Sequence, residues 1–222
     1  MMILLSIYAI GYCSITKFTY FKRITSSLLA CLSAADVGFI LDASASVDET
    51  EYLAQKNAVK DMVTLLHQSG DDFRDGLIQF SEFAQVIYHF NDDFRTVNVT
   101  VDNMDRVPSI TRLDRALRLS QSSLFQTING DRPNVPNVLW IMVDGTQTEQ
   151  QDSEDPVTIT NEIRNNGVDV YVVGIGEEVT RFELEQLAGG RPERVFYAAS
   201  FDVFNSIAFI ERMVKAACPG KL

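Results

Sequence analysis

The stretch "DVGFILDASASVDE", residues 36–49, carries the two signals that decide the fold. Its first half, "VGFIL" (37–41), is a continuous apolar run, which is typical of a strand covered on both faces. The run ends at Asp42, and two hydroxyls follow at alternate positions, Ser44 and Ser46, before a segment with helical spacing begins. The stretch therefore predicts a buried strand with a group of polar side chains at its carboxyl end.

Other apolar runs alternate with amphipathic segments along the chain. "VLWIMV" (138–143) ends on Asp144, "VDVYVVGIG" (168–176) ends on glycines, and a short strand is expected within 194–200. Helical spacing of apolar residues is found in five segments, namely 49–68, 113–125, 156–166, 180–188 and 201–217. This alternation is typical of a sheet built from strand-helix-strand units.

Two of the apolar runs differ from the rest in how they are joined. "GLIQFS" (76–81) and "AQVIYHF" (84–90) are separated only by Glu82 and Phe83, and so short a connection closes an antiparallel pair but not a parallel one. The sequence therefore predicts an α/β fold with a doubly wound, mostly parallel central sheet, one antiparallel edge strand and helices on both faces. In such a sheet ligands bind beyond the carboxyl ends of the strands.

The net charge of the chain limits the classes of partner that it is expected to bind. The 222 residues include 19 basic and 30 acidic ones, a formal net charge of −11. Only three bases and no acid precede Asp36, so the remainder holds 16 bases against 30 acids, or −14. An acidic body repels a phosphate backbone, so nucleic acid is not expected as a partner.

The length of the chain fits one large domain plus an appendage.

The first 35 residues differ in composition from the rest. "MMILLSIYAIGYCSITKF" (1–18) and "ITSSLLACLSAA" (24–35) are apolar runs without an acid, and neither reaches the roughly 18 to 20 apolar residues that a membrane-spanning helix needs. We interpret residues 1–35 as a secretory leader, with an uncleaved anchor as the alternative. The domain then spans 36–218, a short tail spans 219–222, and no membrane insertion of the mature domain is expected.

Three cysteines and one sequon bear on this interpretation. Cleavage between Cys13 and Cys31 would leave Cys31 and Cys218 at the two ends of the domain, where a disulfide could join them in an oxidising compartment. Cleavage after Ala34 or Ala35 would instead leave Cys218 to pair with another chain. The triplet "NVT" makes Asn98 a candidate glycosylation site in a secreted chain.

Several non-metal interpretations of "DASAS" (42–46) can be compared. As a helix cap, Ser46 or Asp48 would accept the first amide hydrogens of the helix that follows. As a nucleophile, a serine would need a base, but the only histidines, His67 and His89, lie in a helical segment and near the end of the hairpin. The GxSxG motif of α/β-hydrolases and the glycines and lysine of a phosphate-binding loop are missing from the sequence.

The metal interpretation fits the residue types best. Asp42, Ser44 and Ser46 supply hard oxygen atoms, and the two hydroxyls lie two residues apart, so in an extended turn both reach the same side. Mg²⁺ takes near-octahedral oxygen coordination, so three side chains from one loop do not suffice to hold it. Further oxygen ligands are expected from other loops.

The order of three motifs resembles the von Willebrand factor type A domain over almost all of 36–218. These are the strand followed by "DASAS", then "TRLDRAL" (111–117), then "VLWIMVDG" (138–145). In that family a metal-ion-dependent adhesion site combines a D-x-S-x-S loop, a threonine and an aspartate from three loops, and leaves one metal position open for a carboxylate of the protein ligand. By matching position, the resemblance implies the following metal ligands: Asp42, Ser44, Ser46, Thr111 and Asp144.

This chain departs from the family pattern in the loops. Ala45 stands where glycine is common, "VPSI" (107–110) replaces a glycine-rich approach to the threonine, and Leu113 replaces a second threonine. None of these departures removes a metal ligand, but they change residues that determine the shape of the loops that carry the ligands.

The resemblance implies a non-catalytic, secreted adhesion or protein-binding module of the extracellular matrix. It would hold Mg²⁺, with Mn²⁺ or Ca²⁺ as alternatives, and bind a Glu or Asp carboxylate of collagen, another matrix protein or a cell-surface receptor. The alternative is a structural extracellular domain whose partners bind independently of metal. A hydrolase that activates water through the ion is disfavoured, because no general base stands near the three motifs in the sequence.

Overall fold

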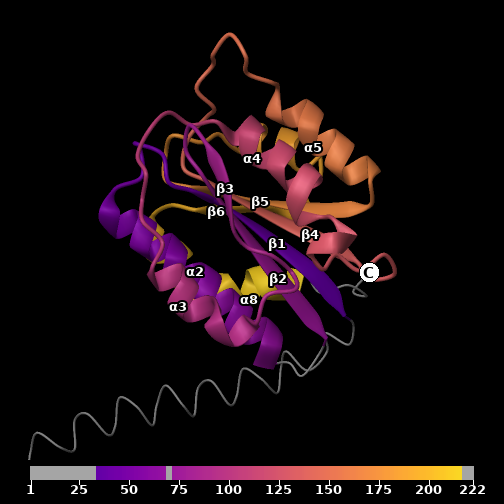
Figure 1. The fold of residues 1–222 in the computed structure, drawn as a ribbon. Helices are drawn as coiled ribbons and strands as arrows, with labels where there is room; N and C mark the ends of the chain where they lie inside the picture. Colours follow the sequence, from indigo (N-terminus) through magenta and orange to yellow (C-terminus); the bar gives the residue numbers. More distant parts are fainter. Residues whose placement is uncertain (1–33, 69–71, 217–222) are drawn as a thin grey trace, which may run out of the picture.

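The computed structural model describes residues 34–68 and 72–216 (Figure 1). Cys31, Cys218, the tail 219–222 and all of the expected leader except Ala34 and Ala35 lie outside the described residues.

A six-stranded sheet with the order β3-β2-β1-β4-β5-β6 forms the centre of the fold. All neighbouring strands are parallel except β2 and β3, so the predicted fold class and the antiparallel edge strand are confirmed. The strands are β1 (Ala35–Asp42), β2 (Phe73–Phe80), β3 (Ala84–Tyr88), β4 (Asn137–Val143), β5 (Val168–Ile175) and β6 (Val195–Ala198). Because β1 pairs with β4 with Ile40 opposite Ile141, both strands end at the same edge of the sheet.

Helices cover both faces of this sheet (Figure 1). One face is packed by α2 (Glu49–Gln68), α3 (Val97–Asp102), α7 (Phe201–Phe204) and α8 (Ile207–Ala216), and the other by α4 (Leu113–Leu119), α5 (Pro156–Asn165) and α6 (Arg181–Leu187). The described residues also include three short 3₁₀ turns, namely η1 (Phe94–Thr96), η3 (Thr127–Asn129) and η4 (Pro192–Arg194).

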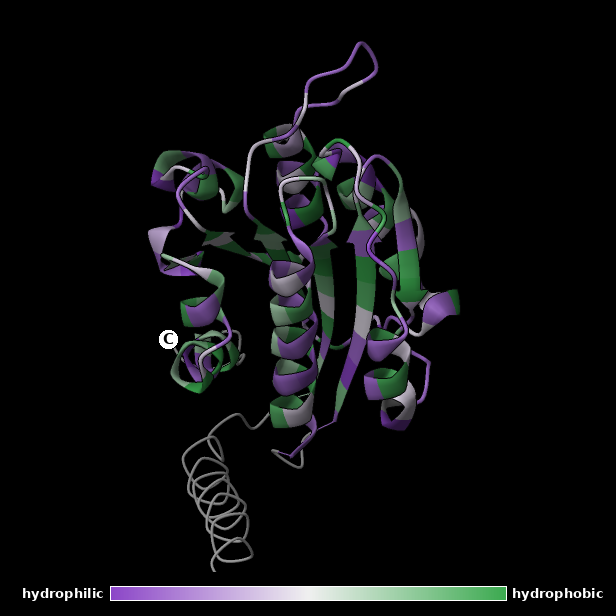
Figure 2. Ribbon diagram, turned by 90° about the vertical axis from the view of Figure 1, so that its left-hand side faces the viewer, coloured by the Kyte–Doolittle hydropathy of each residue, from purple (hydrophilic) through white to green (hydrophobic). Residues whose placement is uncertain are grey.

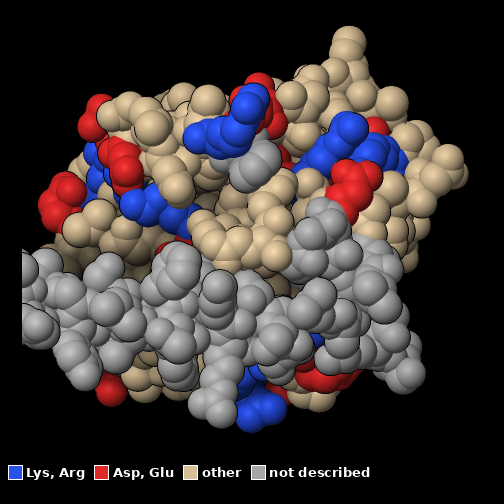
Figure 3. Space-filling view, turned by 90° about the horizontal axis from the view of Figure 1, so that it is seen from below, with Lys and Arg blue, Asp and Glu red and all other residues tan. Residues whose placement is uncertain are grey.

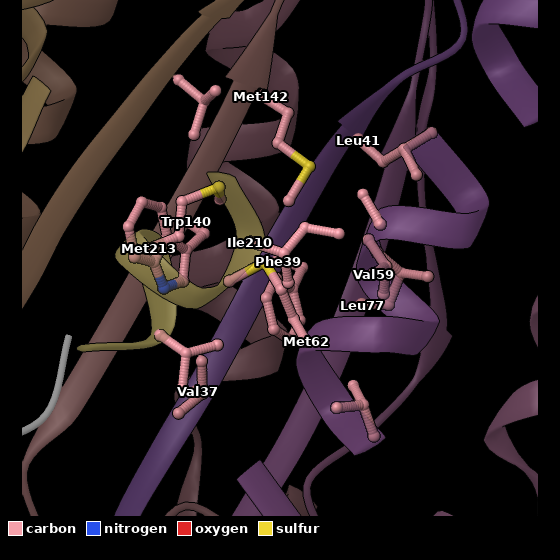
Figure 4. Close-up of a cluster of buried hydrophobic side chains, with 14 of the residues drawn as sticks. Val37, Phe39, Leu41, Val59, Met62, Leu77, Trp140, Met142, Ile210 and Met213 are labelled. Atoms are coloured by element: carbon pink, nitrogen blue, oxygen red, sulfur yellow. The ribbon is translucent and has the colours of Figure 1, made fainter. Parts of the chain in front are cut away.

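The alternation of side chains along the strands feeds two separate cores. Phe39 of β1 and Trp140 of β4 point toward α2 and α8, where Met62 and Met213 meet them (Figure 4). Ile40 points to the opposite face, into a cluster with residues of α4, α5 and α6. The strands are accordingly the most apolar part of the ribbon in Figure 2, which explains why their sequences read as continuous apolar runs.

Two predicted helical segments differ in detail from the structure, and one helix was not predicted. The segment 113–125 forms α4 and then a π-helical turn, η2 (Ser120–Leu124), in which the Phe125 amide donates to the Ser120 carbonyl over 2.9 Å. The segment 201–217 is two helices, α7 and α8, because the chain turns at Asn205 and Ser206. Helix α3 was not expected, since only Val97 and Val101 of its six residues are buried and they give too short a periodic pattern.

The described helices do not combine the length and apolar character needed to cross a membrane. Basic and acidic side chains are interspersed on the uncovered part of the face that Figure 3 shows.

Candidate metal centre

The loop after β1, residues 42–48 and hereafter the Asp42 loop, begins with a fully buried carboxylate. The Ala43 amide donates to the Phe80 carbonyl over 2.8 Å, which extends the β1–β2 pairing up to the loop. Asp42 Oδ1 accepts from the Ser44 amide at 2.8 Å, and Gln55 Nε2 donates to the Asp42 carbonyl over 3.1 Å. The side chain of Asp42 is therefore held in one orientation, while its other oxygen, Oδ2, is buried without a hydrogen-bond partner.

The helix-cap interpretation applies to Asp48 and not to the serines. Asp48 Oδ1 accepts from the Glu51 amide and Glu51 Oε2 accepts from the Asp48 amide, each at 2.8 Å. This reciprocal pair satisfies the first turn of α2 in the manner of a capping box. Asp42, Ser44 and Ser46 are left available for another role.

The two serines connect Asp42 to the third predicted loop. Ser44 is buried, and its Oγ lies 3.0 Å from the Oγ of Ser46. Ser46 is exposed, and its Oγ donates to Asp144 Oδ1 over 3.2 Å. Four of the five predicted ligands are thus linked by hydrogen bonds, from Asp42 through the Ser44 amide and the two serine hydroxyls to Asp144.

Thr111 lies in residues 105–114, hereafter the Thr111 segment, which borders both other loops. The Ala45 amide donates to the Ser109 carbonyl, and the Thr148 amide donates to the Thr111 carbonyl, each over 2.8 Å. Thr111 is buried, but within the described chain its hydroxyl makes no hydrogen bond to the other four residues. The structure therefore brings its segment to the site without bonding its side chain to the others.

The electrostatics of the site favour a cation. Burial and the neighbouring carboxylate of Asp144 raise the pKa of Asp42 to about 7. Burial also raises the pKa of Asp144; Glu51 and Glu178 add to the rise, while the hydrogen bond from Ser46 opposes it. Two neighbouring, desolvated carboxylates with raised pKa values are stabilised as anions when a positive ion lies between them.

The donor set agrees with a hard divalent cation. Two carboxylates and three hydroxyls offer only oxygen atoms, which Mg²⁺ prefers over nitrogen or sulfur ligands. The unpartnered Oδ2 of Asp42 is a free acceptor at the buried end of this set. In the rest of the described residues, no group of three or more His, Cys, Asp or Glu side chains could hold a metal.

The histidines lie at the other edge of the sheet. His67 is near the end of α2 and its Nε2 is 2.6 Å from Asp75 Oδ1 in β2, while His89 follows β3. Because α2 and β3 both run away from the Asp42 edge, neither imidazole is placed to act as a base for Ser44 or Ser46. The remaining candidate, Asn98, is exposed on α3.

Two arginines that shape the site were not singled out in the sequence. Arg106 Nη1 donates to the carbonyls of Ser44 and Val47, over 3.2 and 2.5 Å. Arg112 is 2% exposed and forms a two-pronged ion pair with Asp114. The only signal in the sequence is that Arg112 and Asp114 flank the apolar Leu113 at the start of a helix, which is also the pattern of a solvated helix end.

Comparisons with known proteins agree with this geometry. Residues 36–209 match the von Willebrand factor type A domain. The Homo sapiens collagen alpha-6(VI) chain is 30% identical over 177 residues, which are 78% of this chain and 7% of the collagen chain. Gallus gallus matrilin-1 is 27% identical over 179 residues, 79% of this chain and 35% of matrilin-1.

A solved structure of proximal thread matrix protein 1 from the mussel byssus, with a zinc-occupied MIDAS motif, shares the fold with a TM-score of 0.76. Its sequence identity is 22%, over 85% of this chain and 49% of the mussel chain. This chain therefore spans less than half of each of these three proteins. The relatives are matrix proteins, and their shared domain is not an enzyme. By its sequence match and its fold, the chain belongs to the von Willebrand factor type A domain family.

Proposed function

We propose that this domain is a secreted adhesion module that binds an acidic side chain of a partner protein through a divalent cation. Asp42, Ser44, Ser46, Thr111 and Asp144 would hold the ion, Mg²⁺ in the first place and Mn²⁺ or Ca²⁺ as alternatives. The observation that carries the proposal is the buried, unpartnered Oδ2 of Asp42, a carboxylate that hydrogen bonds link through Ser44 and Ser46 to Asp144.

The charges around the site support a role for the ion in recognition. Asp42 and Asp144 lie together, and Glu51 and Glu178 are close enough to raise the pKa of Asp144 further. These acids alone would repel the carboxylate of a partner. A bound divalent ion supplies positive charge and a coordination position that a Glu or Asp oxygen can fill. Recognition of an acidic partner is therefore expected to depend on the cation.

The relatives support an extracellular location. Collagen VI chains and matrilin-1 are matrix proteins, so we propose collagen, another matrix protein or a cell-surface receptor as the partner class. We further propose that residues 1–35 contain the secretory leader. Ala35 is fully buried in β1, and Arg132 Nη2 donates to its carbonyl over 3.2 Å. Cleavage upstream of Cys31 would preserve this strand and would leave Cys31 and Cys218 for the expected disulfide.

The experiment is a binding assay on immobilised, purified domain with matrix extract, in Mg²⁺ and in EDTA. The Asp144→Ala variant serves as the control, because it removes a ligand from a loop at the surface of the fold. Retention of a matrix protein in Mg²⁺, lost in EDTA and in the variant, supports the proposal. Equal retention in all three would show metal-independent binding and favour the structural alternative.

A calorimetric titration with Mg²⁺ tests the metal step by itself. The EDTA-treated and dialysed domain should give a saturable heat with one site per chain. The absence of heat at millimolar Mg²⁺ and Mn²⁺ would contradict the proposal directly.

A further inference from the structure

The loop that carries Asp144, residues 144–155 and hereafter the Asp144 loop, contains neither helix nor strand. It projects from the body between β4 and α5 (Figures 1 and 2). A projecting irregular loop has many conformations of similar free energy unless side chains tether it. The side-chain and backbone bonds that tether this loop therefore help to fix the position of Asp144, the proposed metal ligand at its start.

Most of the tethers run to the Thr111 segment. Besides the bond from the Thr148 amide to the Thr111 carbonyl, Gln147 Oε1 accepts from the Asp114 amide at 2.8 Å. The Glu154 amide donates to Asp114 Oδ2 over 3.1 Å. Both ends of the projecting part of the loop are thus bonded to the segment that carries Thr111.

Arg112 stands at the centre of these tethers. Its Nε and Nη2 donate to the two carboxylate oxygens of Asp114 over 2.9 and 2.7 Å, and its Nη1 donates to Asp152 Oδ1 over 2.9 Å. Nη2 also donates to the Asp152 carbonyl over 3.1 Å. The Arg112 amide donates to the Ser81 carbonyl over 3.0 Å. One buried residue therefore joins the β2–β3 turn, the Thr111 segment and the Asp144 loop.

We infer that Arg112 and Asp152 form an ionic clamp that positions the Asp144 loop against the Thr111 segment and thereby sets the metal affinity of the site. This inference rests on the proposed function. Arg112 is next to Thr111 in the chain but bonds to none of the five proposed ligand side chains, so it is a positioning residue. Removal of residues that hydrogen-bond to metal ligands lowers metal affinity by about 10- to 100-fold, and a clamp one step further from the ion is expected at the lower end of that range.

The two partners of Arg112 differ in a way that makes the inference testable. The Asp114 side chain is 3% exposed, so its removal would leave a buried guanidinium without its main partner and endanger folding. The Asp152 side chain is 66% exposed, so Asp152→Asn removes the carboxylate charge that faces Arg112 while the buried Arg112–Asp114 pair and the bond to the Asp152 carbonyl stay intact. Arg115 also donates to Asp152, over 2.9 Å, and this bond weakens in the same variant.

The matched control is Asp169→Asn. Asp169 is a half-exposed aspartate of β5 whose Oδ1 lies 2.7 Å from Arg194 Nη1, so the substitution removes the same kind of ion pair. It stands near the amino end of β5, at the edge of the sheet opposite Asp42. Its loss should change the charge and stability of the domain as Asp152→Asn does, without changing the Asp144 loop.

The experiment measures Mg²⁺ affinity by calorimetry and thermal unfolding in EDTA for the unchanged chain and both variants. We expect Asp152→Asn to bind Mg²⁺ about 10-fold more weakly, with Asp169→Asn unchanged and both variants folded in EDTA. Hydrogen exchange of residues 146–153 should be faster in Asp152→Asn alone. If the unchanged chain binds Mg²⁺ and Asp152→Asn binds it within about twofold, the clamp is refuted and the proposed function stands. If the unchanged chain does not bind, the proposed function itself fails.

Discussion

Strand β1 carries a fully buried aspartate near each end, and the two differ in how their negative charge is compensated. Asp36, at the amino end, accepts from the Arg132 side chain at 2.8 Å and from the Arg132 amide at 2.7 Å. Asp42, at the carboxyl end, faces another carboxylate and keeps one oxygen without a partner. The chain itself compensates the first buried charge with Arg132, whereas the second is compensated only by a proton or by a cation from outside. The comparison separates an aspartate that stabilises the fold from one that we propose as a metal ligand.

The largest effect on stability is expected from substitution of Asp36, the aspartate that is paired with Arg132. Asp36→Asn removes the buried carboxylate that pairs with Arg132, and breaking a buried pair costs about 3 to 5 kcal/mol of unfolding free energy. The lower end of this range is expected, because Asp72 still pairs with Arg132 over 2.6 Å. Chemical denaturation in EDTA should show this loss, while the Mg²⁺ affinity of the folded domain stays unchanged. A stability equal to that of the unchanged chain would mean that the pair contributes nothing.

Substitution of Asp42 by asparagine should change the unfolding free energy in the opposite direction. In EDTA at pH 7.5, Asp42→Asn removes a buried charge that repels Asp144 and lacks a partner for one oxygen, so we expect a gain of about 1 to 3 kcal/mol in unfolding free energy. The gain should disappear when the comparison is made in saturating Mg²⁺, because only the unchanged chain binds the ion. A loss of stability in EDTA would show that Asp42 supports the fold as Asp36 does.

The pH dependence of the metal-free domain follows from the raised pKa of Asp42. Between its unfolded value near 3.8 and its folded value of about 7, the folded chain holds a proton that the unfolded chain has released. Stability in EDTA should therefore fall as the pH rises through this window, by up to about 1.4 kcal/mol per pH unit. Aspartates with lowered pKa, such as Asp114 and Asp152, change stability below pH 4 and do not interfere.

Two comparisons check this assignment. In Asp42→Asn the slope between pH 4.5 and 7 should become smaller. In the unchanged chain the Mg²⁺ affinity should increase over the same range, because protons compete with the ion for Asp42. A metal affinity that does not change with pH would contradict the raised pKa.

The smallest effect is expected at a polar residue that belongs to neither end of β1. Asn98 is exposed on α3, and its sequon would allow a glycan if the chain passes through the secretory pathway. Secreted protein from a eukaryotic host should lose mass on glycosidase treatment, and Asn98→Gln should not. Stability and Mg²⁺ affinity should be the same with and without the glycan. An unchanged mass after treatment would remove Asn98 as a modification site.

The sequence predicted the framework better than the detail of the loops. The apolar runs ending at Asp42 and Asp144 identified two strands that the structure places side by side, and the two-residue connection at Glu82 and Phe83 identified the antiparallel edge. These features are local or follow from the way that α/β sheets are wound. The proposed ligand set came from the resemblance to the family, because Asp42, Ser44 and Ser46 taken alone are also good turn or cap residues. The structure shows that Asp48 forms the cap.

The ion pairs could not be read in the same way. Asp36 and Arg132 are separated by 96 residues, and Arg112 meets Asp152 across 40 residues, so no local pattern joins them. A charged residue in a sequence is by default a solvated one, whereas Arg112 is buried because three loops meet over it. The π-helical turn after α4 was missed for a related reason, since Ser120 bonds back to the Leu117 carbonyl in a way that residue spacing does not indicate.

The central claim is that Asp42, unlike Asp36, is a ligand of a bound cation. A Mg²⁺ titration of the dialysed domain by calorimetry tests it most directly, with Asp42→Asn and Asp36→Asn measured under the same conditions at pH 7.5. We predict one saturable site in the unchanged chain, the same site in folded Asp36→Asn, and no measurable binding in Asp42→Asn. Binding that survives in Asp42→Asn, or that is missing from the unchanged chain at millimolar Mg²⁺, would contradict the account.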